Sequence, residues 1–123
     1  TMTTLLLLTQ PANSTIAWHA PKLAQSLLKL NQSLIVFFYQ DAVTIANELV
    51  WRPQDESSLA KQWLELDIDL PVCVSAALWR GVTDSDNAKR HQLPQANLQK
   101  GFRLAGLGEL AEAMLHSERT IQL

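Results

Sequence analysis

Three uninterrupted apolar runs constrain the fold of this chain more than any other feature of the sequence. They occupy residues 5–8, 34–39 and 70–74. A strand with one solvated face alternates apolar and polar residues, whereas a strand that is apolar throughout needs cover on both faces. The runs therefore predict buried strands, with the strands at 34–39 and 70–74 in the interior of a sheet.

Helical patterns lie between these runs. In the first pattern, apolar residues recur at helical spacing, at Ala20, Leu23, Ala24, Leu27 and Leu28. Pro21 suits the first turn of this helix better than its middle, because proline has no backbone N–H to donate. Asp41 is expected to cap a further helix that runs through Leu49, since an aspartate side chain accepts hydrogen bonds from helix-start N–H groups.

The second half of the chain continues the alternation. A helix capped by Ser57 or Ser58 is expected to present Leu59, Trp63 and Leu66, and a second helix at 75–80 is expected to stop at Gly81. A short helix should start within 83–86. The last expected elements are a final strand at 119–123 and, before it, a helix that carries Leu107, Leu110, Ala111, Met114 and Leu115. Residues 97–104 show no pattern that assigns them to an element.

The alternation of strand and helix predicts the fold class. It favours an α/β, three-layer domain with a mostly parallel sheet of four to five strands and helices on both faces. At 123 residues, the chain is expected to form a single domain over residues 1–123. In such sheets, binding and catalysis take place at the carboxyl ends of the strands.

Composition limits the classes of partner. The net charge is −2 and no run of Lys or Arg is present, so direct binding of nucleic acid is not expected. The charged fraction of 18% is low and tryptophans number four, which predicts an oligomer whose partners cover part of the surface. The apolar run at 5–8 lacks the basic flank and cleavage site of a signal peptide and is too short to span a bilayer.

Cys73 is the sole cysteine, which excludes an internal disulfide and fits a cytoplasmic protein. It lies near the end of a predicted strand and just before a predicted helix, where backbone N–H groups favour a thiolate or a persulfide anion. A reactive thiol at such a junction is expected to be partly accessible. Free cysteines are nevertheless among the most buried residues. Position alone slightly favours a buried structural cysteine.

Other candidates for chemistry are weaker. His19, His91 and His116 do not have the spacing of metal ligands, and Ser75 lacks the flanking glycines of a nucleophile elbow. Asp67 and Asp69 are interpreted as solvated loop carboxylates rather than as an acid–base pair.

The sequence GLG at 106–108 precedes a predicted helix and could bind an anion. It lacks the third glycine of a dinucleotide fingerprint, so tight packing of the helix is the favoured interpretation. A nucleotide-binding domain is disfavoured because the chain has no phosphate loop.

Several segments resemble the TusD/DsrE sulfur-relay family, and the resemblance is closest to the TusD subunit type. These segments are FFYQDAV at 37–43, ANEL at 46–49, VCVSAALWRGV at 72–82, NLQKGFRLAGLGELAEA at 97–113 and ERTIQL at 118–123. The resemblance covers nearly the whole chain in order, and the stretch from Cys73 to Gly81 is its most specific part. The chain departs from the family at residues 10–15, where relatives tend to have a glycine-containing loop.

The resemblance implies a sulfurtransferase in which Cys73 is the catalytic residue and carries sulfur as a persulfide. Backbone N–H groups around Ser75 and Ala76 would then stabilise the sulfur anion. Since the chain has no second cysteine, the sulfur must leave to the thiol of another protein. No metal or organic cofactor is needed for this chemistry.

The resemblance also implies partners. TusC-like and TusB-like subunits would assemble with this chain into a heterohexamer, a TusA-like protein would donate sulfur, and a TusE-like protein would accept it. The expected process is 2-thiouridine synthesis in tRNA, without direct contact of this chain with nucleic acid or membrane. The alternatives are a relay protein of sulfur oxidation and a non-catalytic assembly subunit with an inert Cys73.

Overall fold

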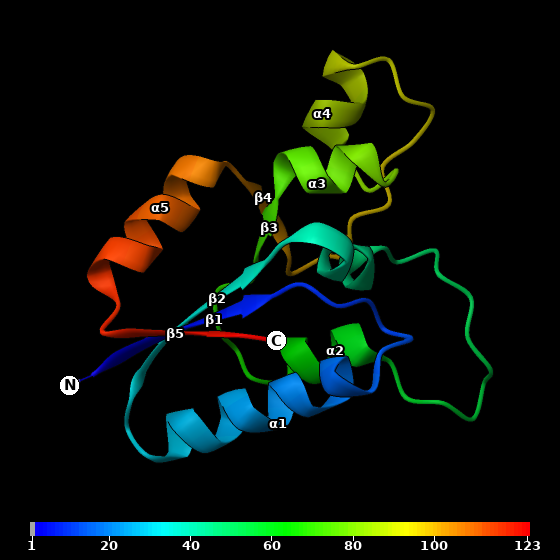
Figure 1. The fold of residues 1–123 in the computed structure, drawn as a ribbon. Helices are drawn as coiled ribbons and strands as arrows, with labels where there is room; N and C mark the ends of the chain where they lie inside the picture. The colour runs from blue at the N-terminus through cyan, green and yellow to red at the C-terminus, as the bar shows by residue number, and fades with distance from the viewer. Residues whose placement is uncertain (1) are drawn as a thin grey trace.

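The computed structural model describes residues 2–123 and contains a five-stranded, all-parallel sheet in the order β4-β3-β2-β1-β5 (Figure 1). The strands are β1 (Thr3–Leu8), β2 (Ser33–Phe38), β3 (Pro71–Cys73), β4 (Arg103–Ala105) and β5 (Arg119–Gln122). The predicted α/β class is confirmed, and the runs at 34–39 and 70–74 form inner strands as expected.

Helices cover both faces of this sheet, which confirms the predicted three layers. They are α1 (Thr15–Lys29), the 3₁₀ helix η1 (Gln40–Ala46), α2 (Leu59–Leu64), α3 (Val74–Trp79), α4 (Ser85–Arg90) and α5 (Leu107–His116). Figure 1 shows α1 and α2 together below the sheet, and α3, α4 and α5 above it. None of the helices within residues 2–123 is both long and apolar enough to cross a membrane.

The core lies around β1 and β2, which pair along their full length from Thr3 opposite Ser33 to Leu8 opposite Phe38. Leu5 and Leu6 point to opposite faces of the sheet because successive strand residues alternate, and both are completely buried. Beneath β2, Phe38 forms edge-to-face contacts with Trp63 and Phe102, at centroid distances of 5.3 and 5.4 Å. The continuous apolar runs are therefore explained by helical cover on each side.

Local signals for several helix ends are confirmed. Ser58 caps α2, since its hydroxyl accepts a hydrogen bond from Lys61 N. Helix α3 ends before Gly81, whose φ of 76° lies in the left-handed region that glycine adopts without strain. Val82 N then donates to Ala77 O at 2.8 Å, as in common glycine-terminated helix ends.

Two predictions for the first half of the chain were wrong. Pro21 lies inside α1 and is buried, because the helix begins earlier, at Thr15 after Ser14. Proline costs this helix one internal hydrogen bond. Asp41 does not cap a helix that runs to Leu49; it lies inside η1, which follows Tyr39 and ends at Ala46.

In the second half of the chain, one element was not predicted from the sequence and one interpretation of the sequence differs from the structure. Residues 103–105 form the edge strand β4, although no element was assigned to them. The glycines at 106 and 108 do not permit tight packing of α5, because a side chain at either position would meet open space. The interpretation of these glycines as packing residues is therefore wrong.

An ionic cluster fixes β4 and the start of α5. The Arg103 guanidinium donates two hydrogen bonds to Asp69, at 2.7 and 2.6 Å, and also binds Glu109 in the first turn of α5. These hydrogen bonds hold the pKa of both carboxyl groups below their usual range and raise the pKa of Arg103. Asp69 is therefore an exposed loop carboxylate, as the sequence predicted, and it also forms an ion pair with Arg103.

The structure predicts a large stability cost for Leu6→Ala. Removing this buried side chain loses its transfer free energy and leaves a cavity, so the free energy of unfolding should fall by about 3 kcal/mol. Leu115→Ala is the control, because Leu115 is 84% exposed and its loss should change stability by less than about 0.5 kcal/mol. Urea unfolding measures both. Equal effects of the two substitutions would contradict the assignment of β1 to the core.

The ionic cluster predicts a pH dependence. Asp69 and Glu109 have folded pKa values below their unfolded values, so their stabilisation is present above the unfolded values near pH 4 and is lost as the pH falls through the folded values. Because the side chains of Arg103, Asp69 and Glu109 are all partly exposed, the cluster should contribute less than about 1 kcal/mol to the free energy of unfolding. Arg103→Met should therefore destabilise the protein at pH 7 but much less at pH 3.

Arg90→Met in α4 is the matched control for this measurement, because no ion pair within residues 2–123 includes Arg90. Its unfolding free energy should follow the wild-type value at both pH values. A cost of Arg103→Met that is the same at pH 3 as at pH 7 would rule out the cluster as its source.

Candidate functional site

Cys73 lies where three elements meet. It is the last residue of β3 and immediately precedes α3, whose first residue is Val74. Cys73 pairs with Ala105 at the end of β4, and Val72 pairs with Phe38 at the end of β2. The inner strand β3 therefore ends level with β4 and one residue beyond β2. The segments that leave β2 and β4 therefore flank the thiol at the carboxyl edge of the sheet, where parallel α/β sheets hold their ligands.

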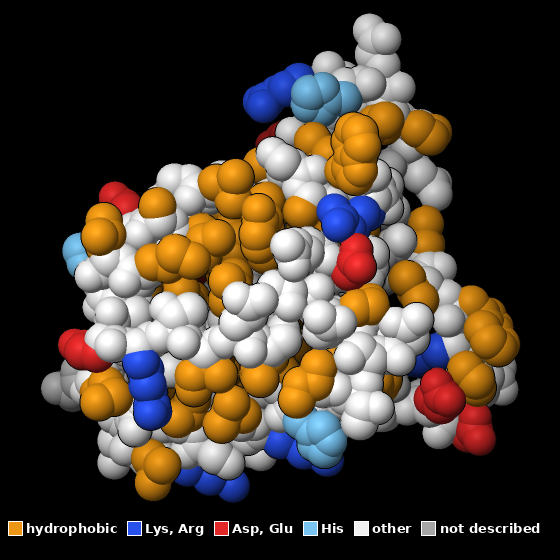
Figure 2. All heavy atoms as spheres, viewed as in Figure 1, with side chains coloured by type: hydrophobic (Ala, Val, Ile, Leu, Met, Phe, Trp, Pro, Cys, Tyr) orange, Lys and Arg blue, Asp and Glu red, His pale blue; other side chains and the backbone are white. Residues whose placement is uncertain are grey.

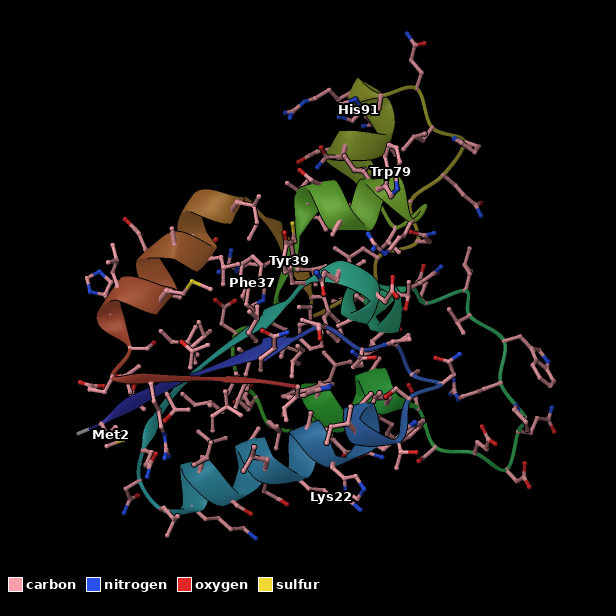
Figure 3. All side chains as sticks on the ribbon, viewed as in Figure 1. Met2, Lys22, Phe37, Tyr39, Trp79 and His91 are labelled. Carbon is pink, nitrogen blue, oxygen red and sulfur yellow. The ribbon has the colours of Figure 1, made fainter. Side chains whose placement is uncertain are left out.

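A cavity of about 330 Å³ opens beside Cys73. Its other lining residues come from the segment after β2, from α3 and its C-cap, and from the start of α5; they are Tyr39, Gln40, Ser75, Ala76, Trp79, Arg80 and Leu107. Figure 3 shows Tyr39 near the first turn of α3 and Trp79 farther along the same helix. The cavity has room for a small group attached to the Cys73 sulfur and for part of a second molecule.

The Cys73 residue is only 1% exposed, so the expectation of a partly accessible thiol is wrong for the isolated chain. The reason is its position on an inner strand, where β2 and β4 cover it on two sides and α3 begins directly after it. Sulfur chemistry at this position has to proceed through the adjacent cavity or after movement of its wall.

Ser75 and Ala76 occupy the first turn of α3, as expected from the sequence. The first N–H groups of a helix have no intrahelical partner four residues earlier, and the Cys73 side chain does not accept a capping hydrogen bond from them. Ser75 is exposed and Ala76 is buried, and both line the cavity. The structure thus brings all three predicted site residues to one place.

Arg80 is a further residue of this site that the sequence did not single out. Its Nε donates to Asp41 Oδ1 at 2.8 Å and its Nη1 donates to Ala76 O at 3.1 Å. The pair joins the C-cap of α3 to η1 through two residues that are 39 positions apart in sequence. The available signal was the position of Arg80 in the VCVSAALWRGV segment, but nothing in that pattern indicates which carboxylate it meets.

Gln40 also lines the cavity and has a φ of 49°, which is uncommon for a residue with a side chain. This conformation costs on the order of 1 kcal/mol and persists only where surrounding contacts impose it. Here it turns the chain sharply between β2 and η1, and it delivers Asp41 to Arg80.

The remaining sequence candidates lie elsewhere. His19 on α1, His91 after α4 and His116 on α5 are all exposed and belong to separate elements. Within the described part of the chain, no three His, Cys, Asp or Glu side chains gather in a way that could hold a metal ion. Leu107, from the GLG sequence, does reach the Cys73 cavity.

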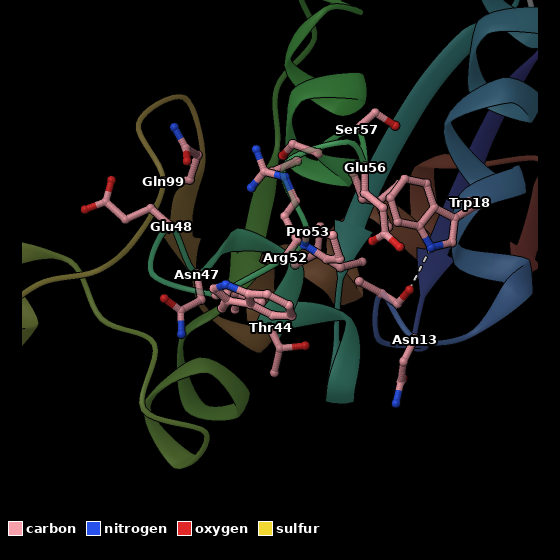
Figure 4. A pocket seen from close by; sticks show the side chains of 17 residues that line it. Asn13, Trp18, Thr44, Asn47, Glu48, Arg52, Pro53, Glu56, Ser57 and Gln99 are labelled. Carbon is pink, nitrogen blue, oxygen red and sulfur yellow. Dashed lines mark hydrogen bonds between the residues drawn. The ribbon is translucent and has the colours of Figure 1, made fainter.

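A second cavity, of about 320 Å³, lies at the carboxyl ends of β1 and β2 and does not include Cys73. Figure 4 shows Trp18, Arg52 and Glu56 among its lining side chains, with Trp18 Nε1 donating to Ala12 O at 2.7 Å. Helix η1 contributes residues to both cavities, Gln40 to the first and Thr44 to the second.

Comparison with known proteins identifies the family. The model of the DsrE/DsrF-like family matches residues 2–123, so the chain belongs to this family, as the sequence predicted. A sulfurtransferase TusD from Serratia proteamaculans is 48% identical over 95% of both chains, and one from Cronobacter sakazakii is 44% identical over 95% of this chain and 96% of its own. These relatives support the predicted sulfurtransferase class.

A solved structure shares the fold. The crystal structure of the ychN protein from E. coli superimposes with a TM-score of 0.74, covering 99% of this chain and 98% of the other. The two sequences are 20% identical, so this likeness supports the five-stranded α/β architecture alone.

Burial predicts slow modification of Cys73. In the folded chain, a bulky aromatic disulfide reagent should react on the order of tenfold or more slowly than in the urea-unfolded chain, because thiol reactivity depends on exposure. The absorbance of the released chromophore measures both rates, and the unfolded chain serves as the control for intrinsic reactivity. Equal rates would contradict the burial of Cys73.

Proposed function

We propose that this single DsrE-like domain carries sulfur as a persulfide on Cys73 and passes it between proteins of a sulfur relay. The observation that supports this most is the placement of the sole thiol beside a cavity at the carboxyl edge of the sheet. The TusD name of its relatives supports sulfur as the transferred group.

The proposed transfer requires no cofactor. The Cys73 sulfur attacks the outer sulfur of a donor persulfide, a new S–S bond forms on Cys73, and the donor's S–S bond breaks to release the donor thiol. Because the chain has no second cysteine to displace that sulfur, an acceptor thiol from another protein must attack the outer sulfur in the second step. This attack returns Cys73 to its thiol state.

The start of α3 supplies groups suited to this chemistry. The N–H groups of Ser75 and Ala76 lie one and two residues into the helix after Val74 and have no carbonyl partner in a preceding turn. Such donors stabilise negative charge without reorganising during the reaction. We assign them the stabilisation of the thiolate and persulfide anions of Cys73.

The proposed relay requires protein partners, and the surface fits this requirement. Figure 2 shows apolar side chains gathered over the face that carries α5 and α3. On these helices Trp79 is 86% exposed and Leu115 is 84% exposed. The proposed partners are TusC-like and TusB-like subunits in a heterohexamer, with a TusA-like donor and a TusE-like acceptor. The proposed end product is 2-thiouridine in tRNA, with no tRNA contact by this chain itself.

The burial of Cys73 favours a second candidate function, a non-catalytic assembly subunit. A cysteine that is 1% exposed fits the packing role of most buried cysteines. In that case the exposed apolar side chains would serve assembly alone, and another subunit would carry the sulfur. The two functions differ in whether Cys73 gains sulfur.

Cys73→Ser should abolish sulfur transfer while preserving the fold and the complex. The hydroxyl has nearly the size of the thiol but stays protonated at neutral pH and is a poor nucleophile toward sulfur. The measurement incubates the protein with a persulfidated donor and follows intact mass. Wild type should gain one sulfur atom that a thiol reductant removes, and the variant should gain none.

Ser75→Ala is the matched control, because it removes a neighbouring hydroxyl but leaves the backbone N–H that we invoke. It should gain sulfur as wild type does. If Cys73→Ser still supports relay in the complex with its partner subunits, the carrier lies in another chain, and the assembly-subunit function replaces the proposal.

A further inference from the structure

Arg80 is the one charged side chain among the residues that line the Cys73 cavity within the described part of the chain. The others are apolar or uncharged: Tyr39, Gln40, Cys73, Ser75, Ala76, Trp79 and Leu107. An arginine guanidinium carries a positive charge in proteins. The cavity wall therefore carries a fixed positive charge.

Two hydrogen bonds hold this charge in place. Asp41 Oδ1 accepts from Arg80 Nε, and the Ala76 carbonyl accepts from Nη1 one turn earlier in α3. The backbone below the side chain is also fixed, since Arg80 N donates to Ala77 O at 3.0 Å and the helix ends at Gly81. Arg80 Nη2 takes part in no hydrogen bond within residues 2–123, so donors are left for a ligand.

The ion pair itself contributes little to folding. The side chains of Arg80 and Asp41 are 28% and 60% exposed, and ion pairs at such exposure add little to stability. Arg80 lines the cavity, whereas its ion-pair partner Asp41 does not. This arrangement presents a cation to whatever occupies the space next to Cys73.

We infer that Arg80 selects anionic sulfur species for Cys73, acting as a specificity-determining residue of the cavity; this inference rests on the proposed function. A persulfide is a stronger acid than a thiol, so at neutral pH a sulfur donor arrives as an anion. Arg80 attracts this anion into the cavity and gives no comparable attraction to neutral thiols, which compete for the same space.

The transfer keeps one negative charge in the cavity throughout. The donor persulfide anion and the Cys73 thiol react to give the Cys73 persulfide anion and the donor thiol. The bond from Cys73 Sγ to the outer sulfur forms, the donor's S–S bond breaks, and the proton of Cys73 ends on the donor sulfur. No oxidant or reductant is consumed. Arg80 pairs with the anion before the transfer and with the Cys73 persulfide after it.

Two alkylating reagents that differ in charge test the effect of the Arg80 charge separately from the accessibility of Cys73. Iodoacetate is an anion and iodoacetamide is a neutral molecule of nearly the same size, so any opening of the cavity changes both rates of Cys73 alkylation together. Arg80→Gln should lower the ratio of the iodoacetate rate to the iodoacetamide rate about threefold, the size expected for one solvent-screened charge at roughly 5 Å. High salt should shrink this difference.

Two control variants separate charge from structure. Arg80→Lys keeps the charge and should keep most of the wild-type ratio, although it cannot make both anchoring hydrogen bonds. Arg90→Gln removes an arginine of α4 that does not line the cavity and should leave the ratio unchanged. A ratio in Arg80→Gln equal to wild type would overturn the inference, even if both rates change. Failure of both reagents to label folded wild type would also overturn the inference, because Cys73 would then be inaccessible and the charge of Arg80 could not affect its reactions.

A sulfur-loading measurement distinguishes this inference from the proposed function. Loading from a small persulfide anion should slow about threefold in Arg80→Gln, in parallel with the iodoacetate rate. If wild type gains no sulfur but the alkylation ratio changes as expected, the proposed function fails and the charge selection stands. If wild type gains sulfur and the ratio does not change, the proposed function stands and the inference about Arg80 is overturned.

Discussion

Burial of the inner strands on both faces is the constraint on which the rest of the structure depends. Leu5, Leu6 and Phe38 are fully buried because α1 and α2 cover one face of the sheet and α3, α4 and α5 lie over the other. Every strand of the sheet runs in the same direction. Parallel strands need crossover connections, and the helices that supply these connections also cover the sheet. Their carboxyl ends meet at one edge, and Cys73 is the last residue of the inner strand β3 there.

The elements that the sequence predicted correctly are those with strong periodicity or clear end signals. The apolar runs at 34–39 and 70–74, the helix start at Ser58 and the helix end at Gly81 depend on local chemistry, and the structure confirms them. Strand β4 escaped prediction because its three residues are too few to show a period. Pro21 was misplaced because tertiary burial compensates for the hydrogen bond that proline removes.

The site was predictable in its centre and not in its surroundings. Cys73, Ser75 and Ala76 are neighbours in sequence, so a predicted strand–helix junction was enough to bring them together. The pairing of Asp41 with Arg80 joins segments that only the folded sheet places side by side. The left-handed backbone of Gln40 and the 1% exposure of Cys73 likewise arise from packing between elements, which no local pattern encodes.

The edge strands of the sheet limit the association of copies of the chain through backbone hydrogen bonds. Both outer strands are short, with three residues in β4 and four in β5, so the sheet offers few unpaired backbone groups to another strand. Arg103 and Arg119 place charged side chains on these two edges, and the Arg119 guanidinium is occupied by Thr4 and Gln32. The isolated chain therefore resists edge-to-edge aggregation. Association is left to side-chain surfaces, which distinguish one partner from another far better than a bare strand edge does.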